Sequence, residues 1–150
     1  MDTACPCGRD SNYADCCQRY HTHQATASTA EQLMRSRYCA FVVGDNRYLR
    51  DSWHPDFRPQ DPLISDDTPW LGLRILAAPA PQADAATVEF VAFYSQQGRV
   101  AQLHERSRFI RMDGMWYYTE GDQLPAIKLA RNDRCCCGSG RKQKHCHAEC

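Results

Sequence analysis

Apolar residues recur at helical intervals in the first third of the chain. Spacings of three and four residues relate the apolar positions Leu33, Met34, Tyr38, Phe41 and Val42. This periodicity predicts a helix from about Ala30 to Val43 with one apolar face. Ser28 with Glu31, or Thr29 with Gln32, fits a capping box at the start of that helix, and Gly44 ends it.

A second helix and a loop are predicted next. Asp45 can cap a short helix over residues 46–50, which Trp53-His54-Pro55 brings to an end. Four prolines between residues 55 and 69 predict an irregular connection.

From Trp70 onward the apolar period changes to that of β-strands. Strands are predicted over residues 70–77, 87–94, 99–111 and 115–119, with Asp113-Gly114 as a tight hairpin turn between the last two. Helices followed by meandering strands give an α+β domain, over residues 28–124, in which helices pack on a curved four-stranded antiparallel sheet.

Composition excludes some classes of protein. The 150 residues have a formal net charge of zero, which gives no global electrostatic argument for binding DNA or a membrane. No apolar run approaches the roughly 20 residues of a membrane helix, and the start of the chain has no apolar leader. We therefore expect a cytoplasmic protein, in which clustered cysteines are metal ligands rather than disulfides.

Ten cysteines are the unusual feature of the composition, and most lie near the two ends of the chain. Cys5 and Cys7 are followed, after eight residues, by Cys16 and Cys17. Four closely spaced thiolates match a tetrahedral zinc site, with iron as the alternative metal. Residues 1–20 are thus predicted to form an N-terminal metal knuckle.

The other end of the chain repeats this spacing. Cys135 and Cys137 are followed, again after eight residues, by Cys146 and His147. Three thiolates and an imidazole also suit zinc, so residues 131–150 are predicted to form a C-terminal knuckle. Cys136 and Cys150 are further thiols that compete for the ligand positions.

The C-terminal segment is also the one distinctly basic stretch. Arg141, Lys142 and Lys144 lie between the two ligand pairs. They either offset the negative charge of a metal–thiolate site or contact a phosphate or an acidic protein surface.

A second candidate site lies between the predicted helix and sheet. Its candidate residues are Tyr38, Trp53, His54, Glu105, Ser107, Trp116 and Tyr118. Strand alternation places His104, Arg106 and Arg108 on one face and Leu103, Glu105, Ser107 and Phe109 on the other. An inward Glu105 would be either a general base or, as we favour, the ion-pair partner of Arg37 or Arg35.

Four other residues of reactive type receive structural interpretations. His54 is interpreted as part of a helix stop that packs on the core rather than as a catalytic histidine. Cys39 reads as a small buried hydrophobe. His21 and His23 read as exposed linker residues, because Cys16 and Cys17 already complete a set of four ligands.

The C-terminal segment resembles the SEC-C motif, the metal-binding tail best known from the SecA translocation ATPase. The resemblance rests on the run from Asn132 through Cys135-Cys136-Cys137-Gly138-Ser139-Gly140 to Cys146-His147. Arg134 and Cys136 stand where the motif has prolines, and Gln143 stands where it has an aromatic residue. The SecA resemblance favours a protein or ribosomal partner over sequence-specific DNA.

The whole chain is similar to the YchJ family of bacterial SEC-C proteins. The similarity is carried by Cys5-Pro6-Cys7-Gly8, residues 33–41, Trp53-His54-Pro55, residues 70–73, residues 105–109 and Trp116-Tyr117-Tyr118. It implies a cystatin-like, nuclear-transport-factor-2-like middle domain between two SEC-C knuckles, and it implies no activity.

Two functions remain open at this point. The first is a zinc-binding interaction module, whose knuckles present rigid surfaces to a partner. The second is a small-ligand binder or enzyme that uses the central pocket. An open cavity of roughly a few hundred Å³ with unpaired polar groups would favour the second, and a cavity filled by Trp53, Trp116 and a Glu–Arg pair would favour the first.

Overall fold

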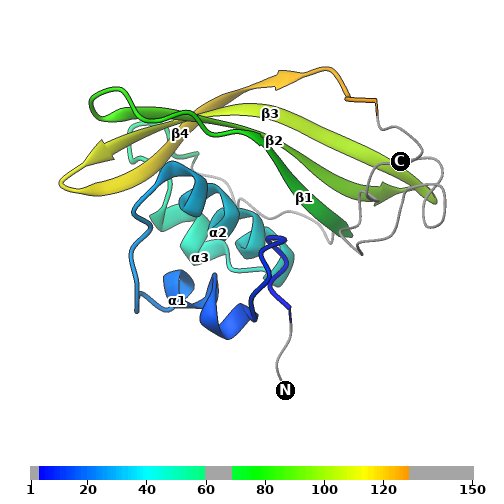
Figure 1. The fold of residues 1–150 in the computed structure, drawn as a ribbon, viewed down its shortest axis with the longest axis horizontal. Helices are drawn as coiled ribbons and strands as arrows, with labels where there is room; N and C mark the ends of the chain where they lie inside the picture. Colours follow the sequence, from blue (N-terminus) through cyan, green and yellow to red (C-terminus); the bar gives the residue numbers. More distant parts are fainter. Residues whose placement is uncertain (1–3, 60–68, 129–150) are drawn as a thin grey trace.

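The computed structural model describes residues 4–59 and 69–128. Within them, a four-stranded sheet forms one layer, and the helices lie together against one face of that sheet (Figure 1). The helical segments are a 3-10 turn at Tyr13–Asp15, α1 (Gln18–His21), α2 (Ala30–Val43) and α3 (Asn46–Asp51). The strands are β1 (Trp70–Ala77), β2 (Ala85–Gln96), β3 (Arg99–Met112) and β4 (Met115–Leu124).

The sheet is an antiparallel meander in the order β1-β2-β3-β4. At its β3–β4 turn, Asp113 and Gly114 have φ values of 54° and 79°. Two consecutive left-handed residues make the turn that matches the twist of paired strands, so the predicted Asp-Gly hairpin is confirmed. The predicted α+β class, with helices packed on a four-stranded antiparallel sheet, is confirmed as well.

β2 and β4 are longer than predicted. The prediction ended β4 at Thr119, whereas the strand continues to Leu124. This extension is polar, and cross-strand ion pairs stabilise it: Arg108 on β3 pairs with Glu120 at 3.0 Å and with Asp122 at 2.6 Å. β2 likewise begins at Ala85, inside the segment that was predicted to be a turn.

Helix α2 has the predicted ends. Thr29 Oγ1 accepts a hydrogen bond from the Gln32 amide at 3.1 Å, while the Gln32 side chain accepts one from the Ser28 amide at 2.8 Å. Gly44 closes the helix with a left-handed φ of 80°. The Asp45 carboxylate then caps α3 by accepting from the Tyr48 amide at 3.0 Å.

The main core lies between α2 and the inner face of the sheet. Its largest buried apolar side chains come from α2, α3, β2, β3 and β4: Leu33, Met34, Tyr38, Leu49, Val88, Phe90, Phe109 and Trp116. The buried cysteines of the N-terminal segment belong to the same apolar cluster. The N-terminal knuckle therefore shares a core with the domain.

Polar contacts also hold the N-terminal segment to α2. Arg35 Nη1 donates to the Cys7 carbonyl at 2.6 Å. The His21 ring hydrogen-bonds Tyr13 Oη at 2.6 Å through Nδ1 and the Ser36 carbonyl at 2.8 Å through Nε2. The prediction of His21 as an exposed linker residue is therefore wrong, because both ring nitrogens are used between elements. His23 is exposed, as predicted.

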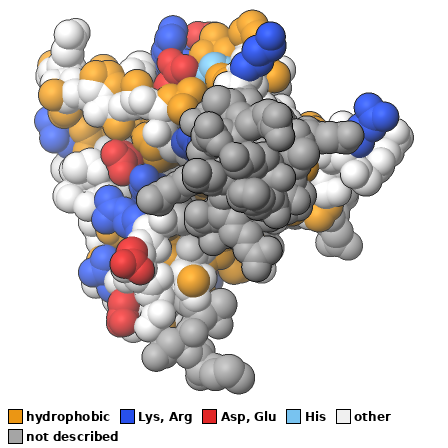
Figure 2. Space-filling model, turned by 45° about the vertical axis from the view of Figure 1, so that its right-hand side comes forward, with side chains coloured by type: hydrophobic (Ala, Val, Ile, Leu, Met, Phe, Trp, Pro, Cys, Tyr) orange, Lys and Arg blue, Asp and Glu red, His pale blue; other side chains and the backbone are white. Residues whose placement is uncertain are grey.

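The outer face of the sheet carries ion pairs beside the buried apolar side chains of Val91 and Phe93. Glu89 pairs there with His104 at 2.8 Å and with Arg106 at 3.1 Å. Residues 125–128 continue beyond β4 along β3, where His104 Nδ1 lies 2.7 Å from the Pro125 carbonyl. In the space-filling view, basic and acidic side chains lie next to one another, in keeping with the zero net charge (Figure 2). Among residues 4–59 and 69–128, no helix combines the length and apolarity needed to cross a membrane.

Candidate functional site

Four cysteines meet at the N-terminal end of the molecule. The Sγ atoms of Cys5, Cys7, Cys16 and Cys17 all lie within 4.8 Å of one another, and all four residues are buried. They are free thiols, with no disulfide among them. The structure thus brings together the four N-terminal residues that the spacing predicted as ligands.

The local backbone explains how eight intervening residues bring the two pairs together. Gly8 has a left-handed φ of 90°, and its amide donates to the Cys5 carbonyl at 3.2 Å. The Cys5 amide donates to the Ser11 carbonyl at 2.9 Å, which closes a small loop. The 3-10 turn at Tyr13–Asp15 then reverses the chain, so that Cys16 and Cys17 face the first pair.

A fifth thiol, which sequence reasoning assigned only to the core, lies beside this cluster. Cys39 on α2 is fully buried, as predicted, but its Sγ lies 3.5 Å from Cys5 Sγ. Local sequence patterns carry no signal for this contact, because Cys5 and Cys39 lie 34 positions apart; in the structure, Arg35, one helical turn before Cys39, binds the Cys7 carbonyl. Cys39 therefore joins the metal knuckle to the domain helix.

The neighbouring thiols alter one another's proton affinities. Hydrogen bonds from Cys17 and then Cys39 lower the pKa of Cys7 to about 6, and the same two thiols lower the pKa of Cys5. Burial raises the pKa of Cys16 to about 12. The lowered pKa values of Cys5 and Cys7 favour the thiolate, the form that binds metal.

This donor set fits a metal ion. Four sulfur ligands fill a tetrahedral coordination shell and leave no position for water or substrate. The arrangement suits a structural metal rather than a catalytic one. The second predicted set, Cys135, Cys137, Cys146 and His147, lies outside the described residues, as do Arg141, Lys142 and Lys144.

A cavity of about 200 Å³ lies between α2 and the sheet. Its lining includes four of the predicted pocket residues: Tyr38, Trp53, Glu105 and Tyr118. The other lining residues are Met34, Arg37, Phe41, Trp70, Phe90, Ala92 and Leu103.

The expected ion pair of Glu105 is not formed in the described part of the chain. Arg37 does point inward and is 3% exposed, but the structure gives no ion pair between it and Glu105. Glu105 Oε2 instead accepts a hydrogen bond from Ser107 Oγ at 2.5 Å, and Arg35 pairs with Glu31 at 3.0 Å. The preferred prediction for Glu105 is therefore wrong, because a neighbour on its own strand engages the carboxylate.

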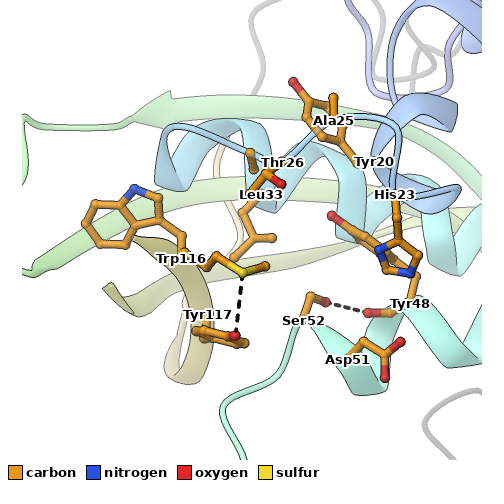
Figure 3. A pocket seen from close by; sticks show the side chains of 12 residues that line it. Tyr20, His23, Ala25, Thr26, Leu33, Tyr48, Asp51, Ser52, Trp116 and Tyr117 are labelled. Atoms are coloured by element: carbon orange, nitrogen blue, oxygen red, sulfur yellow. Dashed lines mark hydrogen bonds between the residues drawn. The ribbon is translucent and has the colours of Figure 1, made fainter. Parts of the chain in front are cut away.

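Three other predicted pocket residues lie elsewhere. Ser107 is fully buried, and His54 is buried against Phe57 and Tyr117. Trp116 lies at a separate depression of about 100 Å³, together with Leu33 of α2 and with Tyr48 and Ser52 from α3 and its end (Figure 3). The prediction that all seven residues share one pocket is wrong, because Trp116 and Tyr118 of β4 line different cavities.

Comparison with known proteins places the chain in a family. Residues 29–121 match the family model described as the YchJ middle, NTF2-like domain. The chain is 48% identical to a UPF0225 protein of Bordetella parapertussis over 122 residues, which cover 79% of this chain and 92% of that protein. It is 42% identical to a UPF0225 protein of Pectobacterium carotovorum, over 97% of this chain and 98% of that protein.

Two solved structures have the same fold. One is the solution structure of a SEC-C motif containing protein from Rhodopseudomonas palustris, with a TM-score of 0.71 and 31% identity, covering 83% of this chain and all of that one. The other is the crystal structure of a SEC-C motif containing protein from Psychrobacter arcticus, with a TM-score of 0.64 and 30% identity, covering 96% and 94% of the two chains. This protein therefore belongs to the YchJ family of SEC-C motif proteins, which has an NTF2-like middle domain.

Proposed function

We propose that the N-terminal cluster binds one structural zinc ion through Cys5, Cys7, Cys16 and Cys17. The observation that supports this most strongly is the meeting of four buried, unbridged thiols within 4.8 Å of one another. Zinc accepts four thiolates in tetrahedral geometry, and such sites stabilise small folds by about 10–16 kcal/mol in zinc peptides. Iron is the alternative metal for the same donors.

The consequence of zinc binding would be a rigid surface at the end of α2. The knuckle shares a core with the domain and is held to it by Arg35 and His21. With four protein ligands the metal has no free position, so its role would be to order the chain around it.

We further propose that this protein is an interaction module whose C-terminal SEC-C segment binds an acidic protein surface. Support comes from the sequence, in which Arg141, Lys142 and Lys144 stand between the two ligand pairs. Charge complementarity of this kind steers association and is weakened by salt. Family membership adds that the structural neighbours are SEC-C motif proteins as well.

Cobalt substitution tests the metal assignment. Co²⁺ bound by four thiolates gives strong sulfur-to-metal charge-transfer absorption, which a tetrahedral oxygen site lacks. We expect Cys17→Ser to lower this absorption markedly in the full chain, because an N-terminal ligand is lost. Cys39→Ser, which removes a buried thiol outside the proposed set of four, is the matched control and should keep the wild-type spectrum. Loss of the signal in the control alone would assign the site to the wrong thiols.

A further inference from the structure

Arg37 carries a charge in the interior of the domain. It projects from α2, is 3% exposed and lines the cavity of about 200 Å³ between α2 and the sheet. Burial lowers the pKa of its guanidinium to about 10, because the charged form is poorly solvated there. A buried charge is ordinarily paired with an opposite charge, since desolvation costs several kcal/mol.

Among the described residues Arg37 forms no close ion pair, although the charge of Glu105 acts on it through space. Arg37 Nη1 donates to the Leu49 carbonyl at 2.9 Å and to Ser52 Oγ at 2.7 Å, both neutral acceptors. The guanidinium also lies over the rings of Trp53 and Tyr118, at 5.0 and 4.6 Å. Both of these hydrogen bonds come from Nη1.

The one carboxylate of the cavity is held in place by its own neighbours. Ser107 Oγ donates to Glu105 Oε2 at 2.5 Å. The Glu105 side chain lies over Gly121 of β4, where even a single Cβ would come within 2.5 Å of its Cδ. Its charge also contributes to the raised pKa of Tyr118, after burial. Glu105 and Arg37 therefore face the same space without neutralising each other directly.

The rest of the cavity wall is apolar and largely aromatic. The aromatic lining residues are Tyr38, Phe41, Trp53, Trp70, Phe90 and Tyr118. Tyr38 and Trp70 meet edge to face, with ring centroids 5.9 Å apart, so ring faces and edges are presented to the space. Because an apolar cavity of about 150 Å³ is enough for benzene, a volume of about 200 Å³ accepts an aromatic ring with a small substituent.

We propose that this cavity binds a small aromatic monocarboxylate, with its carboxylate on Arg37 and its ring among Trp53, Trp70 and Phe90. A carboxylate would place a counter-charge directly at Arg37 and can accept two parallel hydrogen bonds from a guanidinium. Ring stacking and burial would supply the remaining affinity. This site is separate from the proposed metal centre and does not depend on it.

Glu105 limits the charge that the site accepts. Its carboxylate would repel a second negative charge on the ligand, so dianions such as phthalate or phenyl phosphate should bind more weakly than benzoate. A ligand hydroxyl, by contrast, can donate to Glu105. The pair Arg37 and Glu105 thus selects monoanions that carry, at most, a neutral polar substituent.

The test is a titration of the full chain with benzoate, 4-hydroxybenzoate and phenylacetate, and with benzamide as the uncharged isostere. Two of the three tryptophans, Trp53 and Trp70, line the cavity, so intrinsic fluorescence reports on its occupation. Calorimetry gives the affinity independently. We expect saturable binding of at least one carboxylate and binding of its amide weaker by about tenfold or more.

Two variants test the contribution of the Arg37 charge and that of the cavity volume separately. Arg37→Gln should weaken binding of the carboxylate about tenfold or more, whereas Arg47→Gln, on the exposed side of α3, should not change it. Ala92→Leu fills the cavity from β2 and leaves Arg37 intact. This variant therefore tests whether the ligand binds in the cavity even if Arg37→Gln does not fold. No saturable binding up to about 10 mM, equal binding of acid and amide, or unchanged binding to Ala92→Leu would each overturn the proposal.

Discussion

Tyr48 buries a phenol between α2 and α3. Its hydroxyl lies 2.7 Å from Ser36 Oγ, and burial raises its pKa to about 12. Because the unfolded tyrosine loses its proton first, the contribution of Tyr48 to stability is complete below pH 10 and is lost as the pH rises toward 12. Two pH units correspond to about 2–3 kcal/mol.

This gives a prediction for alkaline stability. The free energy of unfolding should fall less steeply between about pH 10 and 12 in Tyr48→Phe than in the wild type. Urea titrations at several pH values would measure the slope. Tyr117→Phe, which removes a hydroxyl that contacts only Met115 Sδ, is the matched control and should keep the wild-type slope. An unchanged slope in Tyr48→Phe would contradict the assignment.

Gly121 makes room for the Glu105 carboxylate. It lies on β4 opposite Ser107, and its φ is not left-handed, so alanine would meet no backbone strain there. An added Cβ would nevertheless lie 2.5 Å from Glu105 Cδ. Gly121→Ala should therefore destabilise the domain by about 1–3 kcal/mol, as measured by chemical denaturation.

A double-mutant cycle checks the cause of that loss. In a Glu105→Ala background the clash is gone, so Gly121→Ala should cost much less than it does in the wild type. Equal costs in both backgrounds would show that the side chain of Glu105 is not the obstacle.

At this scale the sequence predicted which residues face inward but not which residues they contact. Alternation along β3 correctly placed Leu103, Glu105 and Phe109 on the inner face. The predicted partner of Glu105 was wrong. A bulge between Ser107 and Phe109 sets the strand register that brings Gly121 under the Glu105 carboxylate. A bulge of this kind leaves no clear mark in a single sequence.

Among the elements, the N-terminal knuckle depends on α2. Its contacts to that helix include the His21 ring at the Ser36 carbonyl, Arg35 at the Cys7 carbonyl and Cys39 beside Cys5. These bonds use buried backbone carbonyls, and the loss of a partner for such a group costs about 1–3 kcal/mol.

His21→Ala should accordingly loosen the knuckle. We expect a loss of about 1–3 kcal/mol in unfolding free energy and faster amide exchange in residues 5–17, with little change in β2 and β3. Substitution of the exposed His23 by alanine is the control and should leave both unchanged. Equal exchange rates for wild type and His21→Ala would mean that the ring does not hold the knuckle.

The elements themselves were largely predictable. α2, α3, β1 and the Asp113-Gly114 turn follow from periodicity, caps and turn residues, all of which are local. The end of β4 was missed because its polar residues show no apolar alternation and are stabilised across the sheet by Arg108. The docking of His21 and Cys39 was missed because their partners lie 15 and 34 positions away in the sequence.

On the scale of the whole molecule, two sites of different chemistry flank α2. The thiol cluster lies at the knuckle, and the Arg37 cavity lies between the same helix and the sheet. The cavity has the volume that the sequence-based criterion named for ligand binding, but its polar groups Arg37 and Glu105 each have a hydrogen-bond partner. The two roles are compatible, because they use different residues.

The proposed interaction role predicts that partner binding depends on the C-terminal segment, whereas the stability of the central domain does not. Removal of residues 131–150 should leave the thermal unfolding of the central domain nearly unchanged, because its core comes from residues before that segment. The same deletion should abolish capture of a protein partner in a pull-down. A full chain with Arg141, Lys142 and Lys144 changed to glutamine is the matched control for charge. Capture that survives the deletion would place the binding surface elsewhere.

The most direct test of the account is metal content per chain, by elemental analysis of full-length protein purified without chelators or nickel affinity. The proposed centre predicts that Cys5→Ser/Cys17→Ser contains about one zinc fewer per chain than the wild type. The same metal content in both proteins would contradict the assignment of the N-terminal cluster, and so would a wild-type chain that holds no metal while its thiols remain reduced.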